Sequence, residues 1–380
     1  MFYLKVICYS YSPNNAATRR HLGIIQGLSE LGAQLQVTFL LPDGKFSKYS
    51  GALSNVSFKY SWGWLPIKIK AFHMLFYKVY TKRFLGDLKK GDVVLLFGLS
   101  DILHKAVDLP GIKVYHERNE HPEAVLTGSK VAHVSLNDYL KSCKLVDGLF
   151  VISNSLKKYF IEQGMDAWKV HVVNMFVNTG QFDGLVADEK GEEQYVAYCG
   201  AGYNQKDGVD TMIKAFSVFH NKFPEVKLYI IGPKEESPDY NDNLMLCKKL
   251  GVDDYIVFTG VRPNSEIPRL LVNSKAVLLD RPSNQQTQSG FPNKLGEYLM
   301  SGVPAVVTKV GDIPLFLTDK KNAMVAEPDN YIDFAEKLIW LFEHPKEAKQ
   351  IGENGRETAL KHFNYLIESK KILNIINNNL

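Results

Sequence analysis

The sequence has little cysteine: four residues in a chain of 380, widely spaced. No C-x-x-C pair occurs and no histidine stands at metal-ligand spacing from a cysteine, which excludes a zinc ribbon and a disulfide-rich secreted scaffold. These thiols are expected to be buried and reduced, as in a cytoplasmic protein: Cys8, Cys143, Cys199 and Cys247.

Long apolar runs are also absent. No stretch of roughly 18 apolar residues occurs, so we expect no transmembrane helix. The first residues, MFYLKVICYSY, carry Lys5 inside an apolar run and lack the small-residue cleavage site of a signal peptide. They predict a first strand, and we expect a cytoplasmic protein.

The sequence lacks an excess of charge of one sign. Lysine and arginine number 45 and aspartate and glutamate 41, a formal net charge of +4. The basic residues are dispersed and no recognition motif accompanies them, so the composition does not indicate nucleic-acid binding. No D-x-D motif adjoins a predicted strand, so no divalent metal site is expected.

The length of 380 residues, with 45% hydrophobic and 23% charged residues, is typical of a globular protein of two domains. Short β-branched or aromatic runs alternate with amphipathic stretches, which indicates parallel βαβ units in two doubly wound α/β domains. The glycine-bearing, acidic segment TGQFDGLVADEKGEEQ has no periodicity and is the expected linker. The predicted parts are an N-terminal domain at 1–178, the linker at 179–194, a C-terminal domain at 195–355 and a helical segment at 356–380.

The predicted strands fall into two sets. The first half should contain Leu4–Tyr9, Gln36–Leu41, Val93–Phe97, Lys113–His116, Gly148–Ile152 and His171–Val173, and the second half Tyr195–Cys199, Lys227–Ile231, Ile256–Thr259, Ala276–Leu279 and Ala305–Val307. A helix is expected at Arg19–Leu31, ended by Gly32, and a final helix at Glu368–Asn377.

The most informative stretch, Ser289–Val307, reads SGFPNKLGEYLMSGVPAVV. It predicts a loop, a short helix and an apolar strand. Backbone N–H groups at the helix start and the charge of Lys294 would attract a phosphate, and Glu297 could accept hydrogen bonds from two sugar hydroxyls. A connection in which Glu297 only complements the helix dipole fits the residues equally well.

A second anion site is predicted where YCGAGYNQKDGVDTMIKAF joins a strand, a glycine-containing loop and a helix. Gly200, Lys206 and Gly208 lie there, so a pyrophosphate would be held from two sides. The alternative is a solvated lysine at a helix start.

The first motif resembles the nucleotide-sugar signature of retaining GT-B glycosyltransferases of family GT4, also known as glycosyltransferase group 1. The matching residues of E-G-F-G and E-A-x-A-x-G-x-P-V-V are Gly290, Phe291, Glu297, Gly302, Pro304 and Val306. The pattern F-P-x-K-L-x-E-Y, common among bacterial capsule and O-antigen transferases, is also satisfied. Ser289 and Pro292 depart from the signature, where Glu and Gly are usual.

The second motif resembles the family's G-R-x4-K-G, with Ala201 in place of arginine and Asp207 inserted before Gly208. Lys294 is our candidate for the missing cation. The resemblance implies a GT-B fold with two Rossmann-like domains facing across a cleft. It also implies retaining, metal-independent transfer of a hexosyl or N-acetylhexosaminyl group from a UDP- or GDP-linked donor, without a cofactor. The acceptor would be a glycan or an undecaprenyl-linked glycan in surface polysaccharide synthesis.

In the N-terminal half, VYHERNEHPEA resembles the family variant E-R-N-E-x-P, in which Arg118 takes the place of a histidine. His116 ends a strand, where an α/β sheet presents ligands, although a lone histidine is more often structural. In SPNNAA, Asn14 and Asn15 stand where the family has Gly-Gly near the donor phosphates, and asparagine tolerates a left-handed backbone.

The predicted site residues are therefore these. The catalytic residues are Lys206, Lys294, Arg118 and His116, and the donor-binding residues are Asn15, Gly200, Gly232, Pro233, Val261, Arg262, Arg281, Ser289, Gly290, Phe291, Pro292, Asn293, Leu295 and Glu297. The glycine turns after strands are also ordinary turn chemistry. Arg281 would approach the donor or form a surface ion pair with Asp280.

A basic segment, Ile67–Lys90, reads IKIKAFHMLFYKVYTKRFLGDLKK. Phe72, Leu75, Phe76 and Val79 repeat at helical spacing, and basic residues outnumber the single Asp87. Beside Trp62 and Trp64, such a helix would rest on an anionic membrane or pack on the core with a solvated polar face.

Two other functions remain open. A nucleotide-sugar 2-epimerase shares the architecture but would need carboxylates near the sugar, where this chain has Ser289. A non-catalytic partner subunit would explain both Ser289 and Ala201.

Overall fold

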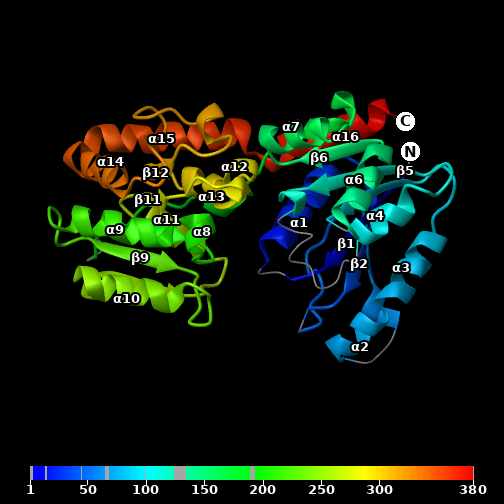
Figure 1. The fold of residues 1–380 in the computed structure, drawn as a ribbon, viewed down its shortest axis with the longest axis horizontal. Helices are drawn as coiled ribbons and strands as arrows, with labels where there is room; N and C mark the ends of the chain where they lie inside the picture. Colours follow the sequence, from blue (N-terminus) through cyan, green and yellow to red (C-terminus); the bar gives the residue numbers. More distant parts are fainter. Residues whose placement is uncertain are drawn as a thin grey trace. The chain divides into compact units, whose positions relative to one another are not determined.

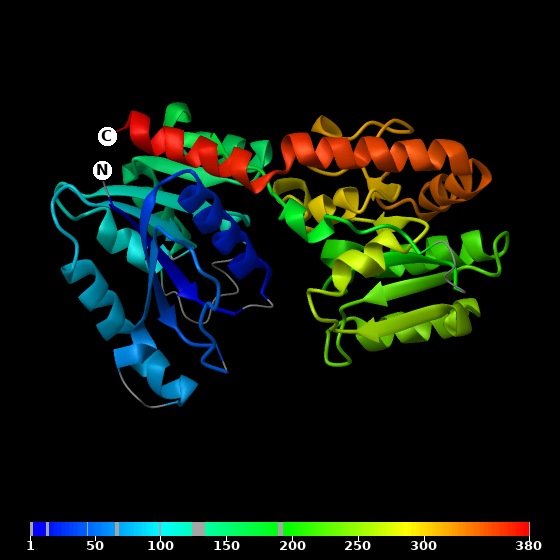
Figure 2. The same cartoon turned by 180° about the vertical axis from the view of Figure 1, so that it is seen from behind.

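The computed structural model describes residues 3–12, 15–43, 45–64, 68–98, 100–123, 134–188 and 193–379. The chain divides into two units, Met1–Asn174 with Tyr365–Leu380, and Met175–Asn364 (Figures 1 and 2). The described part of the predicted linker, 179–188 and 193–194, lies in the second unit, where Phe182 is buried.

The first unit is built on a seven-stranded parallel sheet in the order β3-β2-β1-β4-β5-β6-β7. Its central strands are almost continuous apolar runs, because helices on both faces bury them. The strands are β1 (Tyr3–Ser10), β2 (Gln34–Leu41), β3 (Val56–Tyr60), β4 (Val93–Phe97), β5 (Lys113–Arg118), β6 (Gly148–Val151) and β7 (Val170–Val172).

The second unit has a six-stranded parallel sheet in the order β10-β9-β8-β11-β12-β13. The strands are β8 (Tyr195–Cys199), β9 (Lys227–Ile231), β10 (Ile256–Gly260), β11 (Val277–Leu279), β12 (Ala305–Thr308) and β13 (Met324–Ala326). All predicted strands are present. The sequence analysis missed β3, a half-exposed edge strand, and β13, which is too short to show a pattern.

Helices cover both faces of each sheet. In the first unit they are α1 (Ala16–Glu30), α2 (Lys70–Leu75), α3 (Tyr77–Gly86), α4 (Ser100–Ala106), α6 (Leu136–Leu145), α7 (Asn154–Glu162) and α16 (Tyr365–Asn378). In the second they are α8 (Asn204–Asp207), α9 (Val209–His220), α10 (Tyr240–Leu250), α11 (Ile267–Val272), α12 (Gln285–Ser289), α13 (Lys294–Met300), α14 (Tyr331–Glu343) and α15 (Pro345–His362). None of these helices, in the described ranges, is both long and apolar enough to cross a bilayer.

The last helix, α16, returns to the first unit and packs on α1 (Figure 2). Gly27 of α1 makes this close approach possible, because a Cβ there would lie 2.2 Å from the Ser369 hydroxyl. The predicted segment 356–380 begins too early, because residues 356–362 belong to α15 in the second unit. Cys8, Cys143 and Cys247 are buried, as expected, whereas Cys199 is only half-buried; all four are free thiols.

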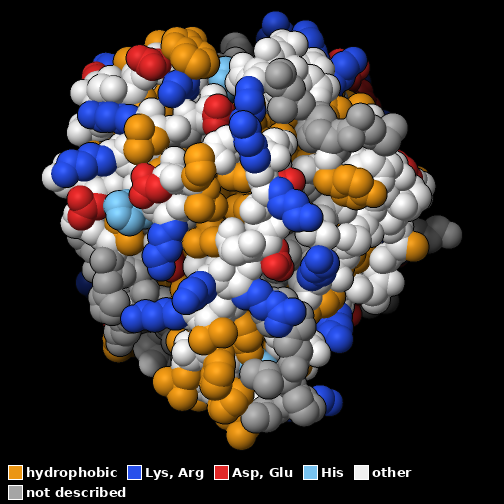
Figure 3. Space-filling view, turned by 90° about the vertical axis from the view of Figure 1, so that its right-hand side faces the viewer, with side chains coloured by type: hydrophobic (Ala, Val, Ile, Leu, Met, Phe, Trp, Pro, Cys, Tyr) orange, Lys and Arg blue, Asp and Glu red, His pale blue; other side chains and the backbone are white. Residues whose placement is uncertain are grey.

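The predicted basic helix is instead two helices, α2 and α3, joined at Phe76; its first residue, Ile67, lies outside the described residues. Two of the four residues expected on one face, Leu75 and Val79, are exposed, and Trp62 is buried. Figure 3 shows a hydrophobic patch at the lower end of this unit, bordered by Lys and Arg side chains.

The chain reverses its direction of winding at one point in each sheet, between β1 and β4 and between β8 and β11. Doubly wound sheets bind ligands at the carboxyl edge beside this point, where the loops after the two strands diverge. In the second unit, those loops begin at Gly200 and Asp280, which places both sequence motifs at this edge.

A buried ion pair ties the first unit together next to the residues where the chain leaves it. Arg20 of α1 contacts Glu117 of β5 at 2.7 Å and donates to the carbonyls of Val173 and Asn174, both at 2.9 Å. The Asn174 N–H donates in turn to Glu368 of α16 at 2.9 Å. Arg20 therefore connects α1, β5 and the residues that follow β7.

Replacing Arg20 by alanine should lower the free energy of unfolding by about 3–5 kcal/mol, because the carboxylate of Glu117 is then buried without its cation. Urea unfolding measures the loss. Lys158→Ala, which breaks an exposed pair with Glu162, is the control and should cost less than about 1 kcal/mol. Equal, small losses in both variants would contradict the role given to Arg20.

Candidate functional site in the second unit

The loop that follows β8 holds two glycines, Gly208 and Gly200, at close approaches to neighbouring groups. Gly208 has φ of +63°, and a Cβ there would lie 1.8 Å from the Asp280 carbonyl oxygen. At Gly200, a Cβ would lie 2.2 Å from Lys294 Nζ. The first glycine lets α9 start against the end of β11, and the second makes room for the ammonium group of Lys294.

Lys294, the first residue of α13, is held by two groups on the opposite side of this loop. Its Nζ lies 2.7 Å from Asp207 Oδ1, 3.2 Å from the Tyr198 hydroxyl and 4.7 Å from the centre of the Tyr198 ring. The Tyr198 hydroxyl donates to Asp207 Oδ2 at 2.6 Å and accepts from the Gly202 N–H at 3.0 Å. We call Lys294, Asp207 and Tyr198 the lysine cluster.

Asp207 is charged in this arrangement although it is buried. Burial alone raises the pKa of its carboxyl, but the ammonium of Lys294, the hydrogen bond from Tyr198 and the charge of Arg281 together bring the pKa below its ordinary value. The ion pair therefore fixes both side chains at neutral pH.

Tyr298 fixes α13 against the end of β8. Its hydroxyl accepts from the Cys199 N–H at 2.6 Å and donates to the Cys199 carbonyl at 3.1 Å. Lys294 and Tyr298 are four residues apart and so lie on one face of α13. The hydroxyl thus sets the distance between α13 and the β8 loop, and with it the position of the ammonium group.

Arg281 supplies a second cation. It follows β11, it is buried, and a Cβ at Gly290 would lie 3.7 Å from its Nη2. The interpretation of Arg281 and Asp280 as a surface ion pair is wrong, since both side chains are buried. Burial and the charges of Asp210 and Asp329 raise the pKa of Asp280 well above its ordinary value.

The site thus holds two cations: Lys294 forms an ion pair with Asp207, and the charge of Arg281 also acts on that carboxyl group. Both cations lie at the carboxyl edge between β8 and β11. Positive groups in a partly buried site bind an anion more strongly than groups in water, and guanidinium and ammonium donors suit phosphate oxygens. This arrangement can bind a phosphate or a pyrophosphate.

The structure brings several predicted donor-binding residues to the same edge. Gly200 donates its N–H to the Ile231 carbonyl, and Gly232 donates to the Gly260 carbonyl, so the loops after β8, β9 and β10 lie in register. Pro233 is buried beside Gly202, whereas Val261 and Arg262 are exposed on the loop after β10.

The SGFPNKLGE motif divides into buried and accessible parts. Phe291 packs on Phe316 and Phe363, each with ring centres 5.6 Å apart, so its side chain supports the loop. Ser289, Pro292 and Leu295 are also buried. Asn293 is exposed, and Glu297 is half-buried in the first turn of α13. Of these side chains, Asn293 and Glu297 remain reachable for a ligand.

The anion site predicted at a helix N-terminus near Lys206 differs in part from the expected geometry, although α9 begins directly after Gly208. Lys206 lies inside α8, which is a single turn with little dipole. The longer helix, α9, has the N–H of Asp210 taken by Asn204 Oδ1 at 3.2 Å. One N–H at the start of α9 is therefore already bonded, and Lys294 is the cation that an ion pair holds at this loop.

His116 of the first unit is not placed as a catalytic base. Its Nδ1 contacts the Leu96 carbonyl at 3.2 Å and must carry the proton, so Nε2 accepts from the Tyr139 hydroxyl at 2.9 Å. Burial, with the charge of Arg118, lowers its pKa to about 3. Arg118 is buried as well, and its Nε donates to the same hydroxyl at 3.0 Å. Both predicted catalytic residues thus have a structural role around Tyr139.

Asn15 has a structural role as well. Its φ of −87° is not left-handed, and its side chain caps α1 by accepting from the N–H groups of Ala17 and Thr18. The N-cap explains the residue without a ligand. Asn14 lies outside the described residues.

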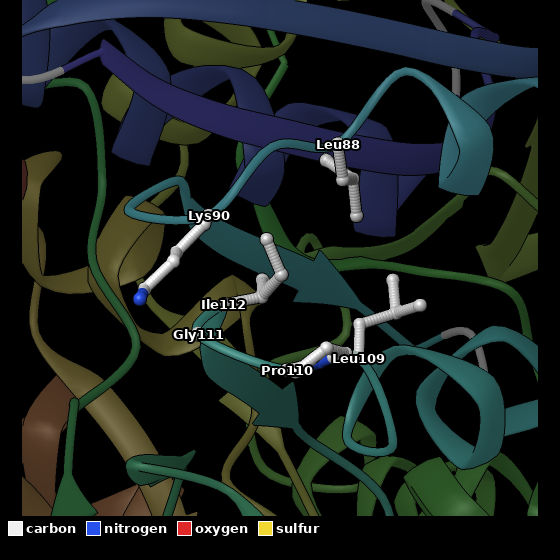
Figure 4. Close-up of a pocket in the computed structure, with 6 residues that line it drawn as sticks. All are labelled: Leu88, Lys90, Leu109, Pro110, Gly111 and Ile112. Atoms are coloured by element: carbon white, nitrogen blue, oxygen red, sulfur yellow. The ribbon is translucent and has the colours of Figure 1, made fainter.

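A hollow in the first unit is separate from this site (Figure 4). Its lining residues come directly before β4 and β5, at the amino edge of the sheet: Leu88, Lys90, Leu109, Pro110, Gly111 and Ile112. That edge is opposite to the one where doubly wound sheets bind ligands.

Sequence reasoning missed Tyr198, Tyr298 and the role of Asp207. The insertion of Asp207 beside a lost arginine was the available signal, because a new carboxylate next to a lost cation indicates a new ion pair. Within the described residues, no group of three or more His, Cys, Asp and Glu is placed to hold a metal ion.

Part of the chain is similar in sequence to known proteins. Residues 186–358 match the family model of glycosyl transferases group 1, and this segment contains the lysine cluster. N-acetyl-alpha-D-glucosaminyl L-malate synthase of Bacillus anthracis is 26% identical over 155 residues, which cover 41% of this chain and 38% of that protein. The chain thus matches about two-fifths of that relative's length.

Solved structures match along the whole chain. HepE of Anabaena in complex with UDP has a TM-score of 0.75 at 15% identity, covering 100% of both chains. Sucrose-phosphate synthase of Thermosynechococcus elongatus has a TM-score of 0.77 at 13% identity, covering 100% of this chain and 99% of the other. These matches, with the two parallel sheets, confirm the predicted GT-B fold.

The ion pair of Asp207 predicts a pH dependence. The pKa of Asp207 is below its ordinary value of 3.8 in the folded chain, so its stabilisation is complete above that pH and is lost as the pH falls through the folded value. Asp207→Asn should lower the unfolding free energy at neutral pH by about 1–3 kcal/mol.

The difference between the native chain and Asp207→Asn should narrow in acid. Unfolding free energies measured from neutral pH down to below pH 3.8 provide the test. The exposed Asp254→Asn is the control. A difference that stays constant below pH 3.8 would show that the carboxylate of Asp207 is not ion-paired.

Proposed function

Because residues 186–358 match the glycosyl transferases group 1 family, we propose that this protein transfers a sugar from a nucleotide-sugar donor to a glycan acceptor. The observation that carries the proposal is the lysine cluster at the carboxyl edge between β8 and β11, inside the matched segment. In this position Lys294 and Arg281 meet the negative charge of a donor pyrophosphate.

The reaction is metal-independent in our proposal, with the charge of the leaving nucleotide stabilised by Lys294, Lys206 and Arg281. The acceptor hydroxyl attacks the anomeric carbon on the face that the phosphate leaves, so the configuration is retained. The departing phosphate oxygen takes the proton of the attacking hydroxyl. No side-chain base is then required, which agrees with the buried, neutral His116.

The donor is a UDP- or GDP-linked hexose or N-acetylhexosamine. UDP is the first nucleotide to test, because the structural neighbour HepE is described in complex with UDP. The acceptor is a glycan or an undecaprenyl-linked glycan of a bacterial surface polysaccharide. The F-P-x-K-L-x-E-Y pattern, satisfied from Phe291 to Tyr298, supports this acceptor class by resemblance.

Incubation with UDP- and GDP-sugars, with and without a chelator, tests this function through nucleotide release. We expect slow release without acceptor, unaffected by the chelator. Isomerised sugar would instead indicate an epimerase. Binding without any turnover would indicate a partner subunit, the function that Ala201 and Ser289 favour.

Glu297→Ala should weaken nucleotide binding roughly 10- to 150-fold, because a carboxylate that accepts hydrogen bonds from ribose contributes about 1.5–3 kcal/mol. Calorimetric titration with UDP or GDP measures the change. Glu347→Ala is a matched control, since Glu347 also lies in the first turn of a helix of this unit. Equal affinities of the two variants would assign Glu297 to the helix dipole alone.

A further inference from the structure

In α2 and α3, the kinds of side chain on the buried and exposed sides are the reverse of those in an ordinary pair of surface helices. The buried side contains polar and aromatic residues. A hydrogen bond of 2.8 Å joins His73 Nδ1 and the Tyr80 hydroxyl, and the Tyr77 hydroxyl donates to Asp101 at 3.1 Å. Aliphatic side chains lie on the exposed side. Folding alone favours the reverse, because burial of aliphatic groups stabilises the folded state.

The exposed aliphatic side chains are large and close in sequence. Their exposed fractions are 60% for Ile69, 43% for Met74, 79% for Leu75 and 55% for Val79. Grouped apolar exposure of this kind marks an interaction surface, whereas scattered single residues do not. We call these four residues, with the basic residues beside them, the α2–α3 surface.

The charged residues along α2 and α3 have one sign. Exposed basic residues alternate with the aliphatic ones, and no acidic residue occurs from Lys68 to Gly86: the cations are Lys68, Lys70, Lys78, Lys82 and Arg83. Figure 3 shows blue side chains around the hydrophobic patch at the lower end of the unit. The partner must therefore accept aliphatic groups and carry negative charge.

We propose that the α2–α3 surface docks on a lipid bilayer that contains acidic phospholipids. Its aliphatic side chains enter the boundary between headgroups and acyl chains, and its cations contact lipid phosphates. A second copy of the chain is a poor partner, because a twofold contact would bring the same cations together. A nucleic acid has no apolar layer for Leu75 and its neighbours.

The position of the surface suits a lipid-linked acceptor. The chain leaves the sheet at the carboxyl end of β3, at Tyr60, before it reaches α2 at Lys70. Figure 1 shows α2 at the end of the unit away from the N-terminus, which begins β1. The proposal of membrane docking is based on exposed apolar residues and charge, and not on sugar transfer. It would therefore still hold if the proposed reaction were not observed.

Co-sedimentation with vesicles tests the proposal. The native chain should sediment with vesicles of phosphatidylcholine and phosphatidylglycerol at low salt, and much less with phosphatidylcholine alone. Added salt should weaken the binding, because screening shortens the reach of the charges. Failure to sediment with the acidic vesicles at low salt would overturn the proposal.

Two pairs of variants distinguish binding through the α2–α3 surface from nonspecific binding to vesicles. Lys78→Gln with Lys82→Gln should lower the partition coefficient roughly 30-fold, since each cation near an anionic surface contributes a factor of about five. The control changes two exposed lysines of α15, Lys346→Gln with Lys349→Gln. Leu75→Ser should also weaken binding, whereas Val186→Ser, at 78% exposure in the other unit, should not.

All four variants should keep the native melting temperature, because the altered side chains are exposed. Equal losses in the surface variants and their controls would overturn the proposal. So would a concentration-dependent dimer that Leu75→Ser dissociates, since the surface would then belong to a second copy.

Discussion

The ion pair between Lys294 and Asp207 is the interaction on which the site in the second unit depends. It joins α13 to the loop after β8 at 2.7 Å, and it holds an ammonium group where the two loops diverge. Tyr198 completes the geometry by contacting both charges, and Tyr298 sets the spacing of α13. Without Asp207, the long side chain of Lys294 would lose the partner that orders it, and rotamer entropy would favour other positions.

The same ion pair explains how this chain compensates for its departures from the family pattern. The arginine usual at position 201 is alanine here, and an aspartate is inserted at position 207. A carboxylate at that point draws Lys294 across the loop, and Arg281 adds a second charge from β11. A cation is thus kept, through a different pair of residues, at the position where we propose that the pyrophosphate binds.

The fold could be predicted from the sequence, because strand and helix periods are local. The alternation of apolar runs gave all central strands, whereas β13, with three residues, is too short for any period. The positions of Lys294 and Glu297 on one short helix were also predictable. The partners of Lys294 were not, since Tyr198 and Asp207 approach it only through sheet packing. His116 was assigned to the catalytic residues because burial, which lowers its pKa, depends on the packing of the whole unit and cannot be predicted from the local sequence.

The most direct test compares UDP with uridine, by calorimetry, on the native chain and on the double variant Lys294→Met with Asp207→Asn, which removes both charges together. Lys294 is predicted to contact only the phosphates. The variant should therefore lose roughly 10- to 150-fold in affinity for UDP and keep its affinity for uridine. An unchanged ratio of the two affinities would contradict the assignment of the lysine cluster to phosphate binding.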